Sequence, residues 1–293
     1  MTPDEVTREV RRIEITTRHL VRDIVAGEYS SAFRGRGVEF AEVREYQPGD
    51  DVRTIDWNVT ARLGSAYVKR YLEERELTVM FLVDFSASGG FGSRVRTKGE
   101  LGAEVAAVLA LAAARNNDRV GAAFFTDRIE HHLAPAKGRR HVLRLISELL
   151  AFQPAGTGTD LGAVLTELEP TLRRRAVLFL LSDFMATGYE QVLGRLARRH
   201  DVVALQLVDP RERALPAAGI VTMWDPETDA WRRIDTSDAA VRAYFARRAE
   251  EFDLDLERGL RERNADLLRL ETARSYAEPL IGFFRRRERM LWR

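Results

Sequence analysis

The sequence predicts an α/β protein built on a doubly wound, mostly parallel sheet with helices on both faces, plus a small N-terminal accessory region. From residue 77 onward, short apolar runs alternate with longer helical patterns. The apolar runs are hydrophobic at successive positions, as in strands that are buried on both faces. Several runs end directly in aspartate or serine, at the place where open α/β sheets bind ligands.

The first 76 residues are expected to form an accessory region that packs on the main domain. Residues 3–26 carry apolar side chains at helical spacing, and Gly27 suits the end of that helix. Residues 30–70 combine many charges with glycine and proline, which predicts short strands and irregular structure. This region is too small for a core of its own, so residues 77–293 are expected to form the main domain.

Within the main domain the expected elements follow in a regular order. Strands are expected at residues 77–83, 120–125, 129–133, 176–181, 202–208 and 266–270, with 129–133 returning beside 120–125 as a hairpin. Helices are expected at residues 98–115, 139–151, 189–200 and 276–292, and also after caps at Thr159 or Asp160 and at Ser237 or Asp238. A second hairpin is expected from residues 220–224 and 231–234.

Composition narrows the functional class. The 293 residues include 46 basic and 45 acidic side chains and no cysteine, so no whole-molecule field attracts nucleic acid and no thiolate chemistry is available. The longest apolar run, Val105–Ala114, is about half the length needed to span a bilayer. No signal peptide is visible at the start. A cytoplasmic location without membrane insertion is therefore expected.

Oxygen-bearing side chains gather at the ends of the expected strands, and they suggest a divalent cation. The candidate ligands are Asp84, Ser86, Ser88, Thr159 and Asp183. Thr157 is the alternative to Thr159 within the same loop. Mg²⁺ prefers six hard oxygens and keeps several waters, so Mg²⁺ is expected, with Mn²⁺ or Ca²⁺ as alternatives. Two carboxylates plus hydroxyls leave a coordination position that an acidic side chain of a partner can complete.

This pattern resembles the metal-ion-dependent adhesion site of von Willebrand factor A (vWA) domains, which has a DxSxS motif, a later threonine and a later aspartate. The resemblance covers about residues 77–210, although Gly89 stands where a methionine or similar residue often follows the second serine. Leu161 and Leu165 match the apolar positions after the family's threonine and favour Thr159. The resemblance implies a vWA-like fold and ligand recognition through the metal, with no bond broken.

The segment upstream resembles the signature of domain of unknown function family 58, a vWA-like family often encoded beside MoxR-type AAA+ ATPases. The matching stretches are Gly35–Phe40, Arg44–Trp57, Ala61–Arg62 and Val68–Tyr71. The resemblance implies a MoxR-type ATPase, or its client, as protein partner in the assembly or maturation of other proteins. It assigns no role to Arg44, Asp50, Asp51, Asp56 and Trp57.

The sequence therefore favours a non-enzymatic, metal-dependent protein-binding module. One alternative is a metal-free scaffold that acts through the charged N-terminal segment. A magnesium-dependent phosphatase is less favoured, because the general acid expected two residues after Asp84 is replaced by Ser86. Nucleic acid is not expected as a partner, because acidic residues interrupt the basic run between residues 34 and 70.

Overall fold

The computed structural model describes residues 2–25, 38–48, 50–52, 55–73, 77–225 and 230–291. The chain divides into two compact units, a smaller one of residues 34–76 and a larger one of residues 1–33 with 77–293. The expected accessory region is therefore split, and its first helices belong to the larger unit. The expected cap at Gly27 and the stretch Gly35–Gly37 lie outside the described residues.

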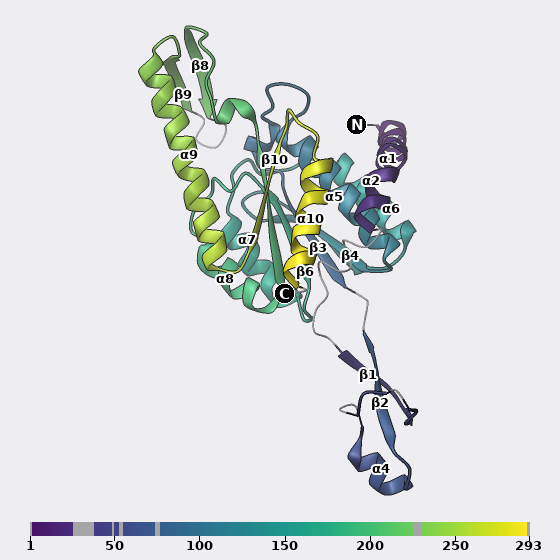
Figure 1. Ribbon diagram of the computed structural model, residues 1–293. Helices are drawn as coiled ribbons and strands as arrows, with labels where there is room; N and C mark the ends of the chain where they lie inside the picture. Colours follow the sequence, from purple (N-terminus) through teal and green to yellow (C-terminus); the bar gives the residue numbers. More distant parts are fainter. Residues whose placement is uncertain are drawn as a thin grey trace. The chain divides into compact units, whose positions relative to one another are not determined.

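The larger unit contains a six-stranded sheet with strand order β10-β7-β6-β3-β4-β5 (Figure 1). In chain order its strands are β3 (Thr78–Asp84), β4 (Arg119–Phe125), β5 (Ile129–Ala136), β6 (Val177–Ser182), β7 (Asp201–Val208) and β10 (Asp266–Glu271). All neighbours are parallel except β5, which returns antiparallel beside β4 at one edge. The predicted doubly wound, mostly parallel sheet is confirmed.

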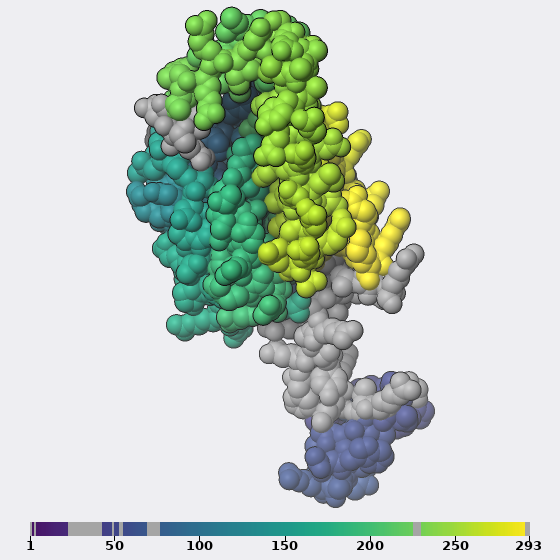
Figure 2. All heavy atoms as spheres, turned by 90° about the vertical axis from the view of Figure 1, so that its left-hand side faces the viewer, coloured from purple at the N-terminus to yellow at the C-terminus, as the bar shows by residue number. Residues whose placement is uncertain are grey.

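Helices cover both faces of this sheet (Figure 1), and Figure 2 shows the molecule from the side on which residues 239–262 lie. One face packs against α1 (Pro3–Thr16), α2 (Arg18–Val25), α5 (Lys98–Arg115), α6 (Arg139–Ala151) and α10 (Ala277–Leu291). The other packs against α7 (Leu161–Leu168), α8 (Glu190–Arg199) and α9 (Ala239–Glu262). Alternate strand residues enter the two cores: Phe81 stacks on Phe179 on the first face, whereas Met80 lies in the second core.

The expected helix at residues 3–26 is interrupted at Thr17. The Thr17 hydroxyl donates to the carbonyl oxygen of Ile13 at 2.5 Å, and the Thr16 hydroxyl donates to that of Arg12 at 2.7 Å. Such bonds from threonine to the preceding turn bend and end helices, so two adjacent threonines separate α1 from α2. Two helices were each expected to begin at one of two possible caps. The structure shows that Asp160, and not Thr159, is the N-cap of α7, and that Asp238, and not Ser237, is the N-cap of α9.

A separate two-stranded antiparallel sheet, β8 (Ile220–Asp225) and β9 (Ala230–Asp235), precedes α9. This hairpin confirms the expected one, and its turn at residues 226–229 lies outside the described residues. Trp224 and Trp231 face each other across the two strands, with ring centroids 6.1 Å apart.

The smaller unit is an antiparallel pair, β1 (Val38–Glu45) and β2 (Tyr67–Glu73), with the helix α4 (Trp57–Leu63) between them. The sequence predicted strands here but missed α4. Asp56 is its N-cap, and its carboxylate accepts hydrogen bonds from the amides of Asn58 and Val59. Gly64 ends the helix in the left-handed region at φ 78°.

We expect Gly121→Ala to destabilise the larger unit. A Cβ on this β4 residue would lie 2.8 Å from the Leu133 carbonyl oxygen and 2.9 Å from Met80 Sδ. Overpacking of this kind costs about 1–3 kcal/mol, measured as the free energy of unfolding in urea. Gly259→Ala is the control, because a Cβ there has only an ordinary contact with Arg263 and alanine favours the helix. Equal loss of stability in both variants would contradict the packing of β4.

Candidate metal centre

Two aspartates come together at the carboxyl edge of the sheet because β3 and β6 are neighbours. Val83 of β3 pairs with Leu181 of β6, so Asp84 and Ser182 follow side by side at the strand ends. The Ser182 hydroxyl donates to Asp84 Oδ2 at 2.5 Å. Asp183 is the next residue, which brings a second carboxylate to the same place.

The DxSxS turn closes over these strand ends through its own hydrogen bonds. The Ser86 amide donates to Asp84 Oδ1 at 2.9 Å. The hydroxyl oxygens of Ser86 and Ser88 lie 3.1 Å apart, and Ser88 donates to Asp183 Oδ2 at 2.9 Å. Four of the five predicted ligands therefore form one continuous hydrogen-bonded chain.

The loop before α7 joins the same turn. The Ala87 amide donates to the carbonyl oxygen of Thr157 at 2.9 Å, while the Thr157 side chain is exposed. Thr159 is half-buried and lies one residue before the N-cap Asp160. The structure thus brings the loop that contains Thr157 and Thr159 to the DxSxS turn.

The oxygen spacing fits a small, hard cation. Oxygens that bind Mg²⁺ at about 2.1 Å in an octahedron lie about 3.0 Å apart along each edge. The Ser86–Ser88 and Ser88–Asp183 separations are 3.1 and 2.9 Å. Among the described residues no three His, Cys, Asp or Glu side chains gather at metal-binding distance. The ligand set offered here is therefore two carboxylates with hydroxyls and water.

Electrostatics also favour a cation at this place. Burial raises the pKa of Asp84 from its ordinary value of 3.8 to about 6, and the negative charge of Asp183 adds to the shift. Hydrogen bonds from Ser182 and Ser86 oppose the shift but do not cancel it. The ionised form of Asp84 is thus disfavoured in the protein alone, and a bound cation would relieve this cost.

Sequence reasoning missed Lys98, the first residue of α5. Its side chain is 2% exposed, and its ammonium lies 2.7 Å from Asp183 Oδ2 and 2.6 Å from Glu212 Oε1. Burial alone would lower the pKa of Lys98, but the charges of Asp183 and Glu212 more than offset it and raise the pKa. A lysine at the start of a helix gave no sign of this role, because the contact depends on the arrangement of three strand ends.

Asp209 is the third aspartate at a strand end, and its hydrogen bonds hold neighbouring loops in place. It is fully buried and accepts from the Ser93 hydroxyl at 2.5 Å and the Thr272 hydroxyl at 2.6 Å. Although burial opposes it, these hydrogen bonds lower its pKa. Its amide donates to Glu212 Oε2 at 3.0 Å. Asp209 therefore anchors the loop at Ser93 and holds the glutamate that Lys98 contacts.

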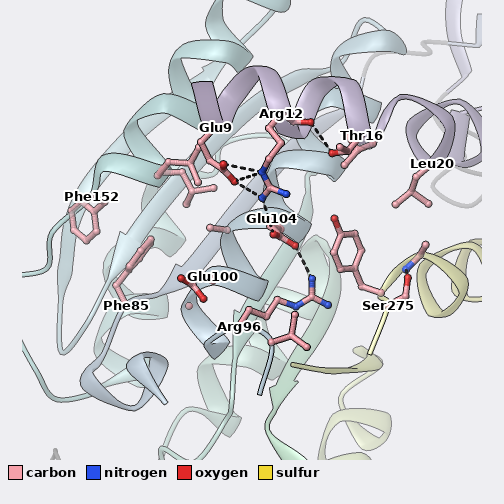
Figure 3. A pocket seen from close by; sticks show the side chains of 18 residues that line it. Glu9, Arg12, Thr16, Leu20, Phe85, Arg96, Glu100, Glu104, Phe152 and Ser275 are labelled. Atoms are coloured by element: carbon pink, nitrogen blue, oxygen red, sulfur yellow. Dashed lines mark hydrogen bonds and ion pairs between the residues drawn. The ribbon is translucent and has the colours of Figure 1, made fainter. Parts of the chain in front are cut away.

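A groove of about 900 Å³ lies where Phe85, the residue between Asp84 and Ser86, meets α1, α5 and α6 (Figure 3). Phe85 packs edge-on against Phe152, with ring centroids 4.8 Å apart. Opposite these rings, ion pairs link Arg12 to Glu9 and Glu104, and Glu104 to Arg96. Phe85 therefore ties the DxSxS turn to the helical layer.

The chain belongs to the family described as protein of unknown function DUF58, whose model matches residues 42–253. An uncharacterized protein of Mycobacterium tuberculosis is 33% identical over 284 residues, which cover 96% of this chain and 89% of that protein. An uncharacterized protein of Mycobacterium avium is 33% identical over 159 residues, which cover 53% of this chain and 94% of that protein. The family match covers residues 42–76 of the smaller unit and residues 77–253 of the larger unit.

Several solved structures are similar to this chain at 12–15% sequence identity. An aerotolerance-related membrane protein from Bacteroides fragilis gives a TM-score of 0.48 at 15% identity, covering 72% of this chain and 99% of that chain. BatB from Bacteroides thetaiotaomicron gives 0.45 at 12% identity, covering 74% and 100%. The SpRpn10 VWA domain gives 0.38 at 12% identity, covering 71% and 95%.

The expected cytoplasmic location is wrong in the light of these comparisons. The Bacteroides fragilis protein and an uncharacterized protein from Vibrio fischeri are named as membrane or membrane-spanning proteins. The expectation rested on composition and on the lack of a long apolar run, which do not fix the compartment. Within the described part of this chain, no helix has the length and apolar character to cross a membrane.

The raised pKa of Asp84 gives a test of the site's electrostatics. The folded protein holds this proton more tightly than the unfolded chain, so the free energy of unfolding falls as pH rises from about 4 to about 6. Without added metal, we expect the free energy of unfolding of Asp84→Asn to exceed that of wild type by about 1–3 kcal/mol at pH 7.5. At pH 4 the two proteins should differ little in stability.

Urea denaturation at the two pH values measures this effect. Asp255→Asn is the matched control, because Asp255 is exposed on α9 and its substitution should change stability little at either pH. A wild type that is more stable than Asp84→Asn at pH 7.5 would contradict the electrostatic account.

Proposed function

We propose that this protein is a binding module that recognises an acidic side chain of a protein partner through a divalent cation. One observation carries the proposal: Asp84, Ser86, Ser88 and Asp183 form one hydrogen-bonded chain on the carboxyl edge of the sheet, in which the Ser86–Ser88 and Ser88–Asp183 oxygens lie at octahedral-edge spacing. The side chains of Asp84, Ser86, Ser88 and Asp183, with Thr159, would hold Mg²⁺, or Mn²⁺ or Ca²⁺ in its place. The bound ion would supply an electrophilic position for the partner's carboxylate.

The proposed partner is a MoxR-type AAA+ ATPase or a client presented to it. Support for this choice comes from the signature stretches Arg44–Trp57, Ala61–Arg62 and Val68–Tyr71, which lie in the residues that match the family. We propose that the module acts by binding and catalyses no reaction. The proposed outcome is the assembly or maturation of other proteins.

Titration calorimetry with Mn²⁺ and Mg²⁺ tests the metal. Wild type is expected to bind one ion per chain, and Asp84→Ala is expected to give no heat above dilution. Asp255→Ala is the matched control, because it removes a carboxylate from an exposed position on α9. Equal heats for wild type and Asp84→Ala would contradict a metal site at Asp84 and therefore metal-dependent binding of the partner.

Affinity capture from native lysate, with and without a chelator, tests the partner. We expect a MoxR-type ATPase or its client to be retained by wild type and lost both with chelator and with the double variant Ser86→Ala, Ser88→Ala. The variant's circular dichroism should match wild type. Capture that survives both treatments would contradict recognition through the metal.

One observation favours the metal-free scaffold as a second candidate. None of the side chains of α4 is buried, and Trp57 and Leu63 are 70% and 60% exposed. An exposed tryptophan on a helix of the smaller unit is a common anchor for a protein partner. If Trp57→Ala abolishes capture of the same protein while the double serine variant retains it, the scaffold replaces the metal-dependent module.

A further inference from the structure

Lys98 is a buried cation that stands at the candidate metal centre. Its Nζ and the Ser88 hydroxyl both donate to Asp183 Oδ2, and the Met185 amide donates to Asp183 Oδ1 at 3.1 Å. Its second partner is Glu212 Oε1, and the other oxygen of that carboxylate, Oε2, accepts from the Asp209 amide. The ammonium is thus fixed between one candidate ligand and one carboxylate outside the ligand set.

The choice of lysine at this position is informative. The chain has 43 arginines and only three lysines, at positions 69, 98 and 137. Among the described residues, Lys98 is the only basic side chain of Lys or Arg type that is buried. An ammonium is a compact point charge, whereas a guanidinium is a wide planar fork. The site therefore holds a small monovalent cation in contact with the carboxylate that is expected to hold a divalent one.

The charges at this end of the sheet explain what such a cation does. The ammonium lies between Asp183 and Glu212, and Asp84 is joined to Asp183 through Ser86 and Ser88. When ionised, these four groups carry three negative charges and one positive charge. Lys98 removes one unit of negative charge and makes the site less attractive to a second cation. It also keeps the metal-loaded site from becoming net negative, which would repel an incoming carboxylate.

We propose that Lys98 determines what this site accepts: it weakens the binding of the divalent ion and strengthens the binding of an acid group to the ion-loaded site. This inference rests on the proposed function, because it assigns a role toward the same cation. Asp183 Oδ2 accepts from both Ser88 and Lys98, so the ammonium acts on a carboxylate that would also hold the ion. Lys98 is therefore a specificity-determining residue of the centre.

The expected size of the effect follows from distance. An ion that Asp183 bound directly or through one water would lie about 5–7 Å from the ammonium. At that range, even the screening of bulk water leaves about a tenfold effect on the affinity for a dication. The effect on an acid group bound to the ion has the opposite sign and is smaller, because that group carries a single charge.

The test measures Mn²⁺ affinity of the whole protein by electron paramagnetic resonance. Lys98→Met, which keeps the length of the side chain and removes its charge, is expected to bind Mn²⁺ at least about tenfold more tightly than wild type. Lys98→Arg, which keeps the charge, should not bind more tightly than wild type. Lys137→Met is the matched control, because Lys137 is exposed, and its affinity should be unchanged.

A second readout separates this role from a merely structural one. In the Mn²⁺-loaded proteins, acetate serves as the acid probe and its binding is followed by water proton relaxation. Wild type should bind acetate more tightly than Lys98→Met. If Lys98→Met unfolds, the double variant Lys98→Met, Glu212→Gln removes the ammonium together with the carboxylate that it would leave uncompensated. Because Glu212 is outside the ligand set and the ammonium contacts Asp183, the same two changes are expected at a smaller size.

The outcomes distinguish the two proposals. If wild type binds Mn²⁺ in an Asp84-dependent manner and the folded Lys98 variants bind it equally or more weakly, the role of Lys98 is overturned and the metal-dependent module stands. If Mn²⁺ binding is unaffected by Asp84→Ala, or is absent from wild type and Lys98 variants alike, both proposals fail. Mn²⁺ binding that appears only in the Lys98→Met variants supports the competition between the two cations.

Discussion

The structure depends on one constraint at the carboxyl edge of its sheet, where buried carboxylates from neighbouring strands must be compensated. Asp84 and Asp183 are 5% and 7% exposed, and they follow strands that are hydrogen-bonded to each other. Both are largely removed from solvent, and hydroxyls, amides and Lys98 supply their hydrogen bonds. The loops that follow β3, β6 and β7 have the conformations that this compensation requires.

The same constraint links the candidate site to the rest of the larger unit. Lys98 begins α5, whose buried face lies in the first core. Glu212 follows β7, and Asp209 connects that strand end to Ser93 and to Thr272 beyond β10. Through Lys98 and Glu212, a change in charge at Asp183 therefore acts directly on α5 and on the end of β7. This connection is the physical basis on which a bound cation could alter the surface that a partner meets.

Much of this arrangement was predictable from sequence, and the reasons are local. The sequence predicted which strands end at the site, because polar residues directly follow the apolar runs of β3 and β6. These two strands pair with each other, and their pairing brings four of the five candidate ligands together. The break between α1 and α2 was not predicted, because it depends on two threonine hydroxyls that compete with the helix. Lys98 was missed because its partners lie 85 and 114 residues away in sequence.

The most direct measurement is an anomalous difference map from crystals soaked in Mn²⁺. The account predicts one strong peak at the carboxyl edge of the sheet, at bonding distance from the Ser86 and Ser88 hydroxyls, with Asp183 still in contact with Lys98. A map without a peak there, from crystals in which these side chains keep the positions described above, would contradict the existence of the metal centre.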